Sequence, residues 1–228
     1  MKVNSKFVTS DQIDIHPDLE KVVLKNMKNI FAKPYTPFAR QSYENILDRY
    51  IKGTFEKLVL DIGCGVGEST YHLAQKHSDA LVIGVDKSED RILRNNKFKK
   101  ELPKNMMLVR ADIIDLLRLI YQDRDQFKIA YQYILYPNPY PKQKHLKLRW
   151  YGHSLFKYMM LLNTPMEIRS NWLLYLKEFE LSAKLYMALE SKIEQYIPEI
   201  MITPFERKYF NSNHQLFRLL LKPVPIGK

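Results

Sequence analysis

The sequence predicts an α/β fold in which a mostly parallel sheet of seven strands carries helices on both faces. Three observations lead to this prediction. Short apolar runs alternate along the chain with segments whose apolar residues recur at helical spacing, as in strands joined by crossover helices. A glycine-rich turn follows the first of these runs and precedes a helix. The 228 residues suffice for one such domain with a sizeable core.

The chain begins with two expected helices. Residues 18–33 have apolar side chains at helical spacing, and Pro34 and Pro37 indicate where this helix ends. A second helix is expected over residues 38–50. We therefore interpret residues 1–37 as an N-terminal helical extension and residues 38–228 as the main domain.

Strands and helices then alternate. Four of the five residues at the start of the first apolar run are Leu58, Val59, Leu60 and Ile62, which is typical of a buried parallel strand. Strands are expected over residues 58–62, 80–86, 107–112 and 129–136. Helices are expected over residues 68–75, 88–100 and 115–121.

The second half of the chain continues the alternation. Leu185, Leu189, Ile193 and Tyr196 recur at helical spacing, so we expect a helix that buries this stripe in the core. Helices are expected over residues 153–162 and 180–196. Strands are expected over residues 171–176, 201–207 and 215–221.

The glycine turn, Gly63-Cys64-Gly65-Val66-Gly67, predicts a site for an adenosine-type cofactor. Glycine tolerates positive φ and lets a ligand approach the backbone, and the helix start offers free N–H groups. The third glycine comes one residue earlier than in the dinucleotide pattern, where Glu68 now stands. Because this carboxylate repels a pyrophosphate, and Asp61 can hold a cationic amino group, the pattern favours S-adenosylmethionine.

Two further acids end the next two strands. Asp86 comes 23 residues after Gly63, a spacing at which an acid accepts hydrogen bonds from ribose hydroxyls. Asp112 ends the third strand and is expected to receive the adenine amino group. The glycines and three strand-end acids together predict the cofactor site of a Rossmann-like class I methyltransferase.

Composition indicates the kind of partner. The net charge of +11 and the pI near 9.5 favour polyanions, nucleic acid before an anionic membrane, although a generally basic proteome also explains them. No apolar run approaches the ~20 residues of a membrane span, and the first residues lack the apolar core of a signal peptide. The single cysteine, Cys64, excludes an intramolecular disulfide and is expected to pack inside the turn. Metal-binding spacing is absent, and we expect a cytoplasmic protein.

The fourth strand leads into a proline-rich loop, Tyr136-Pro137-Asn138-Pro139-Tyr140-Pro141. Three prolines in five residues stiffen the backbone, so Asn138 and Tyr140 are expected to project from it. Tyr140 is suited to stack on an unpaired base. The loop is followed by basic side chains suited to pair with phosphates, namely Lys142, Lys144, Lys147 and Arg149, together with His145.

Here the sequence resembles a known family. The segment Pro137-Asn138-Pro139-Tyr140-Pro141-Lys142-Gln143-Lys144-His145 resembles the Pro-Asp-Pro-Trp-Pro-Lys-Lys-x-His signature of the tRNA (guanine-N7)-methyltransferases. Residues 203–207 are similar to the Thr-x-Phe-Glu-x-Arg segment before that family's last strand. Residues 176–180 stand at the expected end of the fifth strand, where the family has Thr-Asp-Trp. The resemblance extends from about residue 58 to the end of the chain.

The resemblance implies transfer of a methyl group from S-adenosylmethionine to N7 of a guanine in tRNA. Asn138 replaces the family's catalytic aspartate and is implied to face both the base and the cofactor. Tyr140 replaces a tryptophan, Glu178 an aspartate that contacts the substrate, and Asp61 the more usual glutamate. The residues implied to bind the substrate are Tyr140, Lys142, Lys144, Glu178, Thr203, Phe205 and Glu206.

Two other functions stay open. Asn138-Pro139-Tyr140 is similar to the Asn-Pro-Pro-Tyr loop of methyltransferases that act on exocyclic or amide nitrogens of nucleic acid or protein, although the second consecutive proline is missing. In that loop the Asn oxygen accepts a hydrogen bond from the target NH2. The other alternative is an RNA-binding relative without catalytic activity. Monomer, homodimer and complex with an accessory subunit all remain open.

Overall fold

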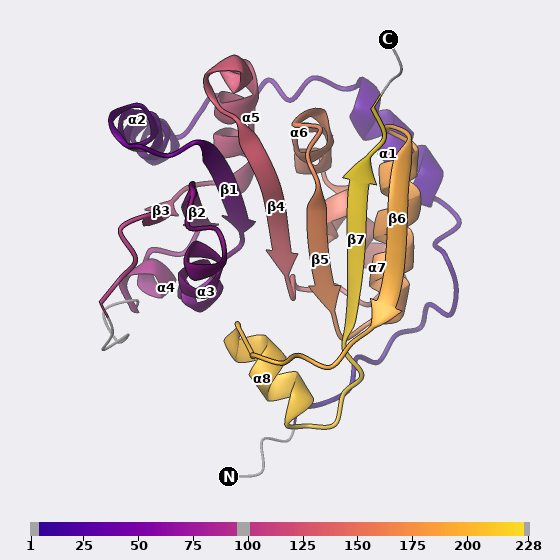
Figure 1. The fold of residues 1–228 in the computed structure, drawn as a ribbon. Coiled ribbons are helices and arrows are strands. Elements are labelled where there is room, and N and C mark those ends of the chain that lie inside the picture. Colours follow the sequence, from indigo (N-terminus) through magenta and orange to yellow (C-terminus); the bar gives the residue numbers. More distant parts are fainter. Residues whose placement is uncertain (1–4, 95–100, 226–228) are drawn as a thin grey trace. The chain divides into compact units, whose positions relative to one another are not determined.

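The computed structural model describes residues 5–94 and 101–225, and the chain forms two compact units (Figure 1). One unit consists of residues 33–135 and contains the glycine turn. The other consists of residues 1–32 and 136–228 and contains the proline-rich loop. The N-terminal segment therefore packs with the C-terminal half of the chain rather than forming a unit of its own. For example, Asn26 Nδ2 donates to the carbonyl oxygen of Gly152 at 2.9 Å.

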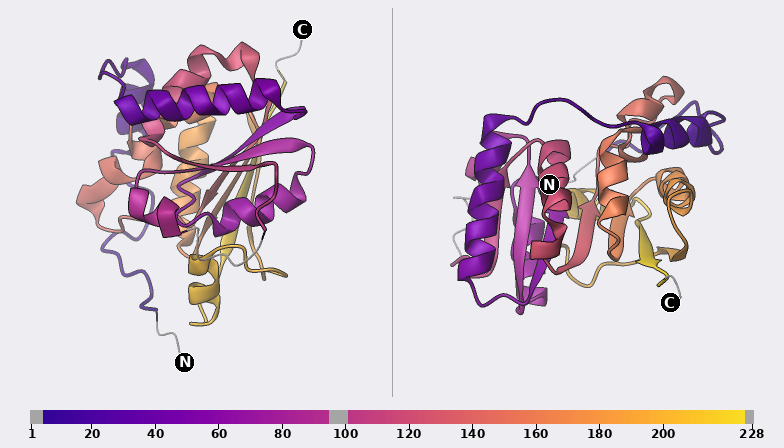
Figure 2. Two further views of the ribbon diagram at one scale, coloured as in Figure 1. Left: turned by 90° about the vertical axis from the view of Figure 1, so that its left-hand side faces the viewer. Right: turned by 90° about the horizontal axis from the view of Figure 1, so that it is seen from above.

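The described residues of the unit 33–135 form four parallel strands in the order β3-β2-β1-β4. They are β1 (Lys57–Ile62), β2 (Ala80–Asp86), β3 (Met106–Arg110) and β4 (Ile129–Leu135). The helices are α2 (Pro37–Lys52), α3 (Glu68–Lys76), α4 (Glu89–Leu93) and α5 (Ile113–Gln122), and a 3-10 turn, η2 (Arg124–Gln126), precedes β4. The left view of Figure 2 shows α2 on one face of these strands and α3 on the other.

Burial explains why these residues form parallel strands. Leu58, Val59 and Leu60 in β1 are at most 1% exposed, and every residue of β2 is buried. Continuous apolar runs are typical of parallel strands that are covered on both faces. Because β1, β2 and β3 are paired in parallel, their carboxyl ends lie at one edge of the unit. Ligands of open parallel sheets bind at this edge.

The other unit contains three strands in the antiparallel order β5-β7-β6. They are β5 (Met166–Ser170), β6 (Leu189–Gln195) and β7 (Phe217–Pro223). α7 (Leu173–Lys184) packs against all three. The other helical elements described are α1 (Leu19–Lys28), α6 (Leu155–Leu161), α8 (Pro204–Phe210), η3 (Gln143–Leu148) and η4 (Trp150–Gly152).

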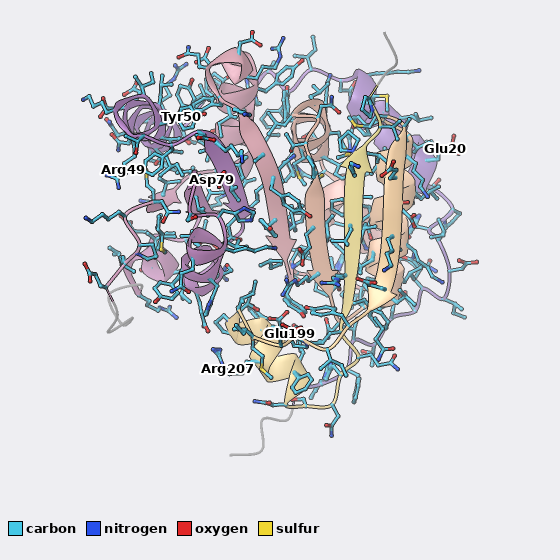
Figure 3. All side chains as sticks on the ribbon, in the orientation of Figure 1. Glu20, Arg49, Tyr50, Asp79, Glu199 and Arg207 are labelled. Carbon is cyan, nitrogen blue, oxygen red and sulfur yellow. The ribbon has the colours of Figure 1, made fainter. Side chains whose placement is uncertain are left out.

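Aromatic rings fill the core of this second unit. The ring centroids of Tyr151 and Tyr175 lie 5.0 Å apart, and those of Phe156 and Phe179 lie 5.1 Å apart. All four side chains are fully buried. Charged side chains such as Glu20 and Glu199 instead project from the surface (Figure 3).

The predicted fold class is confirmed, since the described residues form seven strands, most of them parallel, that alternate with helices. The four strands predicted before residue 137 correspond to β1, β2, β3 and β4, and α3 follows the glycine turn as predicted. The helix predicted at 153–162 corresponds to α6, and the strand predicted at 215–221 corresponds to β7.

The prediction for the fifth strand is wrong. β5 is Met166–Ser170, and most of residues 171–176 belong instead to the start of α7. A short apolar run does not distinguish a buried strand from a buried helix by its periodicity. The segment that follows the strand is therefore Asn171-Trp172, and Glu178 lies inside a helix.

The helix predicted over 180–196 is also wrong beyond Lys184, because Leu189–Gln195 forms β6. Leu189 and Ile193 are four residues apart, which places two side chains on one face of a helix but also on one face of a strand. Both residues are half-buried, so the predicted core stripe is wrong as well.

The strand predicted over 201–207 is wrong for a local reason. α8 begins at Pro204, and the hydroxyl of Thr203 accepts a hydrogen bond from the backbone N–H of Glu206 at 2.9 Å. Threonine as the cap and proline as the first helical residue together favour a helix start.

Two predictions are only partly covered by the structure. α4 accounts for Glu89–Leu93 of the helix predicted over 88–100, and residues 95–100 lie outside the described residues. Within the residues that the structure describes, no helix is both long enough and apolar enough to cross a membrane.

Candidate active site

The glycine turn joins β1 to α3 and is held by the end of β2. The backbone N–H groups of Gly63 and Cys64 both donate to the carbonyl oxygen of Val85, at 2.8 and 3.0 Å. The N–H of Gly65 donates to Oδ2 of Asp86 at 3.0 Å. The end of β2 therefore fixes the turn through its backbone.

Gly65 and Gly67 show why the turn needs glycine. Their φ angles are 61° and 82°, which cost other L-residues about 1–2 kcal/mol. A Cβ atom on Gly67 would approach Leu108 Cδ1 to 2.6 Å, whereas one on Gly65 would meet no atom within 4 Å. Gly67 therefore serves packing, and Gly65 presents bare backbone to open space that a ligand can occupy.

Asp61 is buried at the end of β1. Ser69 and Thr70, in the first turn of α3, both donate their hydroxyl groups to Oδ2 of Asp61, at 2.6 and 2.7 Å. Burial raises the pKa of Asp61 to about 6, although the two hydroxyl hydrogen bonds oppose the increase. A cationic group beside the carboxylate would lower this pKa again, which fits the predicted contact with an amino group.

Asp86 ends β2, and Asp112 lies two residues after the end of β3. Asp86 Oδ1 accepts from the N–H of Ser88 at 2.8 Å, while Oδ2 accepts from the turn. Asp112 caps α5 by accepting from the N–H of Ile114 at 3.2 Å, and its Oδ2 lies 3.3 Å from Lys87 Nζ. A carboxylate oxygen has a further lone pair for a ligand. The ribose and adenine contacts stay predictions.

This strand edge fits S-adenosylmethionine, which would be held by Asp61, Asp86, Asp112 and the glycine turn. Three carboxylates suit a ligand that carries positive charge and no phosphate. Cys64 lies within the turn, where burial raises the pKa of its thiol well above the ordinary value. The thiol therefore stays neutral, in keeping with a packing role.

In the second unit, the proline-rich loop holds Asn138 between two strained residues. Tyr136 and Tyr140 have φ angles of 54° and 46°. Such conformations in residues other than glycine cost of order 1–3 kcal/mol and persist where the surrounding structure holds them. The Tyr136 N–H is fixed by the carbonyl oxygen of Arg169 at 2.9 Å. Asn138, in contrast, is exposed.

The orientation of the Asn138 amide follows from its neighbour. The backbone N–H of Tyr140 donates to Asn138 Oδ1 at 3.3 Å. Since a backbone N–H can only donate, the oxygen of the amide faces Tyr140. The exposed Nδ2 group is therefore available to donate hydrogen bonds to a ligand.

The basic segment after the loop borders a surface groove. Lys142 and Lys144 are exposed, as predicted for residues that contact phosphates. The groove has a volume of about 770 Å³ and is lined by Thr9, Ser10, Asp11, Lys142, Gln143 and Lys144. N-terminal residues thus share this surface with the two lysines. The contacts of Tyr140, Lys142 and Lys144 with substrate stay predictions.

Glu178 requires a correction, because it is neither at a strand end nor exposed. It lies on α7 with a fully buried side chain, and its Oε2 atom is 2.5 Å from Arg149 Nη1. A carboxylate buried against its own chain does not contact RNA in this conformation. The residues that follow β5 are Asn171 and Trp172, so a tryptophan stands after this strand as in the family's Thr-Asp-Trp segment.

The segment that resembles the family's Thr-x-Phe-Glu-x-Arg pattern starts α8. Thr203 and Glu206 are buried, whereas Phe205 is exposed. Glu206 accepts hydrogen bonds from Arg169 Nη1 at 2.8 Å and from the backbone N–H of Ile202 at 2.9 Å. It also accepts from the hydroxyl groups of Tyr136 and Tyr196. Like Glu178, Glu206 is fully buried against its own chain, so it does not contact substrate in this conformation. Contacts of Thr203 and Phe205 with substrate stay predictions.

Sequence reasoning missed the role of Arg149, which it grouped with the phosphate-binding lysines. Arg149 is fully buried, and its guanidinium lies over the ring of Trp172 at 5.2 Å. Arg149 stands between two large apolar residues, Leu148 and Trp150. This local pattern could have indicated that Arg149, unlike the lysines, is buried. Its partners, Gln12 and Glu178, are too distant in sequence to be found by spacing.

The chain is similar to known methyltransferases. Residues 56–219 match the family described as "Putative methyltransferase". The chain is 31% identical to the tRNA (guanine-N(7)-)-methyltransferase of Chlorobium phaeobacteroides over 188 residues, which cover 75% of this chain and 82% of that one. It is 26% identical to the enzyme of the same name from Thermotoga maritima, over 78% of this chain but only 57% of that one. This chain therefore spans little more than half of the Thermotoga protein.

Solved structures show the same fold at low sequence identity. An antibiotic-related methyltransferase matches with a TM-score of 0.60 and 15% identity, over 88% of this chain and 98% of that one. A 16S rRNA (adenine(1408)-N(1))-methyltransferase from Catenulisporales acidiphilia, solved with the cosubstrate SAM, matches with a TM-score of 0.55 and 15% identity over 87% and 98%.

The parallel strands, the glycine turn and the strand-end acids define a class I methyltransferase that depends on S-adenosylmethionine. Within this class, the matched residues and the curated relatives decide the family. The chain belongs to the tRNA (guanine-N7)-methyltransferase family.

Proposed function

We propose that this protein transfers a methyl group from S-adenosylmethionine to N7 of a guanine in tRNA. Family membership supports the reaction, and the strand-end carboxylates support the cofactor. The single observation on which the choice of guanine N7 as the target atom rests is the orientation of the Asn138 amide. Its Oδ1 accepts from the Tyr140 N–H, so Nδ2 is free to donate.

A donor at this position suits the edge of guanine that carries N7. Guanine presents two acceptors there, N7 and O6. Asn138 Nδ2 would donate to O6 and leave the lone pair of N7 for the methyl group. S-adenosylmethionine, when bound, supplies an electrophilic methyl group. The nucleophile carries no proton, so the reaction needs positioning rather than a general base.

The family's aspartate would add a negative charge that stabilises the cationic product, and Asn138 lacks it. A single preorganised group of this kind contributes a few kcal/mol at most, roughly. Asn138 therefore retains positioning and loses part of the electrostatic stabilisation. We expect a functional but slower enzyme.

The same contact bears on a target NH2 group. An amino target requires an asparagine oxygen that accepts its hydrogen bond, and Asn138 Oδ1 has one lone pair left for this because the other accepts from the Tyr140 N–H. Both donors of Nδ2 are left for guanine O6. Guanine N7 is therefore the better-supported target, and the amino target remains an outcome of the test.

The RNA-binding part of the proposal rests on exposed residues of the second unit. Enzymes that modify RNA act on unpaired or splayed bases, and a half-buried Tyr140 can stack on one. Lys142 and Lys144 would contact the phosphates around it. A cytoplasmic location follows from such a substrate and is part of the proposal.

The test is incubation of the full chain with labelled S-adenosylmethionine and unmodified tRNA, followed by nucleoside analysis. Label in N7-methylguanosine is expected. A transcript made with 7-deazaguanosine, which has carbon in place of N7, should accept no label. Label in an amino-methylated base, or labelling of the 7-deaza transcript, would support the amino target. Cofactor binding without transfer to any RNA would support a relative without activity.

A further inference from the structure

Arg149 contacts the backbone of the proline-rich loop, although its side chain is fully buried. Its Nε atom donates to the carbonyl oxygen of Tyr140 at 3.1 Å. Its Nη2 atom also lies 3.5 Å from the carbonyl oxygen of Pro141 and 3.4 Å from that of Lys142. One guanidinium group thus contacts three consecutive carbonyl groups, of which the first belongs to the second residue after Asn138.

Glu178 balances the charge of Arg149, and its carboxylate accepts hydrogen bonds from four groups. It accepts hydrogen bonds from Arg149 Nη1 and from the hydroxyl of Tyr151, both at 2.5 Å. It also accepts from Gln12 Nε2 at 2.6 Å and from the backbone N–H of His16 at 2.7 Å. Because a buried ion pair gains from further hydrogen bonds that satisfy both partners, this arrangement suits a fixed position for the arginine.

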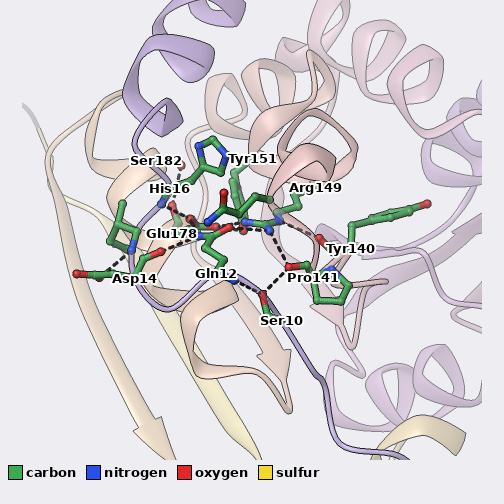
Figure 4. A network of polar contacts seen from close by, with 12 residues as sticks. Ser10, Gln12, Asp14, His16, Tyr140, Pro141, Arg149, Tyr151, Glu178 and Ser182 are labelled. Carbon is green, nitrogen blue, oxygen red and sulfur yellow. Dashed lines mark hydrogen bonds and ion pairs between the residues drawn. The ribbon is translucent and has the colours of Figure 1, made fainter.

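Gln12 joins the two charged groups from the N-terminal segment. Its Oε1 atom accepts from Arg149 Nη2 at 2.9 Å, while its Nε2 atom donates to Glu178. Figure 4 shows the side chains of Gln12, Arg149 and Glu178 meeting beside the backbone of Tyr140 and Pro141. The network therefore unites the N-terminal segment, the loop and α7.

The contacts form a chain that leads to Asn138. Arg149 holds the carbonyl oxygen of Tyr140, whose strained backbone has a φ angle of 46°. The N–H of the same residue orients the Asn138 amide. We propose that Arg149 is a positioning residue that acts through Tyr140 to orient Asn138 toward the base, an inference that rests on the proposed function.

Lysine could not take this role, although it would keep the charge. The planar guanidinium donates in several directions at once, whereas an ammonium group is a single point charge on a flexible stem. Arg149→Lys should therefore keep an ion pair with Glu178 but release the Tyr140 carbonyl oxygen. The matched control for stability is Leu219→Ala, which removes a buried core side chain of the same unit, on β7, that takes part in none of these hydrogen bonds.

The first measurement separates binding from turnover, well below the melting temperature of each variant. For Arg149→Lys we expect kcat to fall about tenfold or more, while the affinity for S-adenosylhomocysteine changes less than about twofold. Leu219→Ala should lower the melting temperature but leave kcat near that of the wild type. A wild-type kcat for folded Arg149→Lys would overturn the proposal.

The second measurement does not depend on activity. Backbone hydrogen exchange in residues 137–145 should become faster in Arg149→Lys than in Leu219→Ala, because the loop loses its anchor. Equal exchange in the two variants would overturn the positioning role even if the wild type is active. If the wild type methylates no tRNA but this difference in exchange is found, the proposed function fails while the anchoring of the loop stands.

Discussion

The two units of this protein hold their polar groups in different ways. In the unit of residues 33–135, Asp61 and Asp86 are held by hydroxyl and backbone groups at most 21 residues away. In the other unit, Arg149 and Glu178 depend on Gln12, which is 137 and 166 residues away. The proposed cofactor site around Asp61 and Asp86 is thus held by residues close in sequence. The proline-rich loop is held through Arg149 by residues far away in sequence. A change in the first unit should act locally, while a change in the second should act through the loop.

The largest effect is expected at Asn138. Asn138→Ala removes the donor to guanine O6, and loss of one hydrogen bond at this position should lower kcat about tenfold to a hundredfold. The affinity for S-adenosylhomocysteine, measured by calorimetry, should stay within about twofold if the substrate loop and the cofactor edge are separable. A kcat equal to that of the wild type would remove Asn138 from the reaction.

The next effect is a pH dependence at Asp61. Its pKa in the folded protein is about 6, above that of an unfolded aspartate, so the folded state binds the extra proton. The stability that this group contributes is therefore present at low pH and is lost as pH rises through about 6. Unfolding curves of the cofactor-free protein should show this loss between about pH 4 and pH 6, and those of Asp61→Asn should not.

Cofactor binding should show the opposite trend, because the ionised carboxylate is the form that attracts an amino group. The affinity for S-adenosylmethionine should fall up to about tenfold per unit as pH drops below about 6. Asp61→Asn should bind about tenfold or more weakly at pH 8 and lose this dependence. A wild-type affinity in Asp61→Asn would show that the carboxylate does not hold the cofactor.

Gly65 and Gly67 provide a matched pair within the turn. Gly67→Ala should lower the free energy of unfolding by about 1–3 kcal/mol, because it adds strain and displaces Leu108. Gly65→Ala should cost less stability, about 1–2 kcal/mol, but should weaken S-adenosylhomocysteine binding more. Denaturant unfolding and calorimetry measure the two quantities. The reverse order of the binding effects would place the cofactor away from Gly65.

The smallest effect concerns the exposed lysines. In Lys142→Ala/Lys144→Ala, the slope of log affinity for tRNA against log salt should flatten by roughly 1–2, since each phosphate contact contributes about 0.7–0.9. Lys192→Ala/Lys222→Ala removes the same charge from exposed positions on β6 and β7. An equal change in both double variants would mean that net charge, rather than the basic segment, determines RNA binding.

The sequence predicted one unit better than the other for a physical reason. The secondary structure predicted for residues 58–86 is confirmed, because strand, turn and helix follow one another within a single βαβ unit. The prediction for residues 189–195 is wrong because Leu189 and Ile193 fit one face of a helix and one face of a strand equally well. Only pairing with β7 decides between the two.

The sequence by itself determined the fold class, the glycine turn with its strand-end acids, and the loop that carries Asn138. These features depend on residue type and short spacing, which are present in the chain before it folds. Only the tertiary structure decided that Arg149 and Glu178 are buried together. Their burial and their hydrogen bonds to Gln12 depend on segments distant in sequence, so no local pattern specifies them.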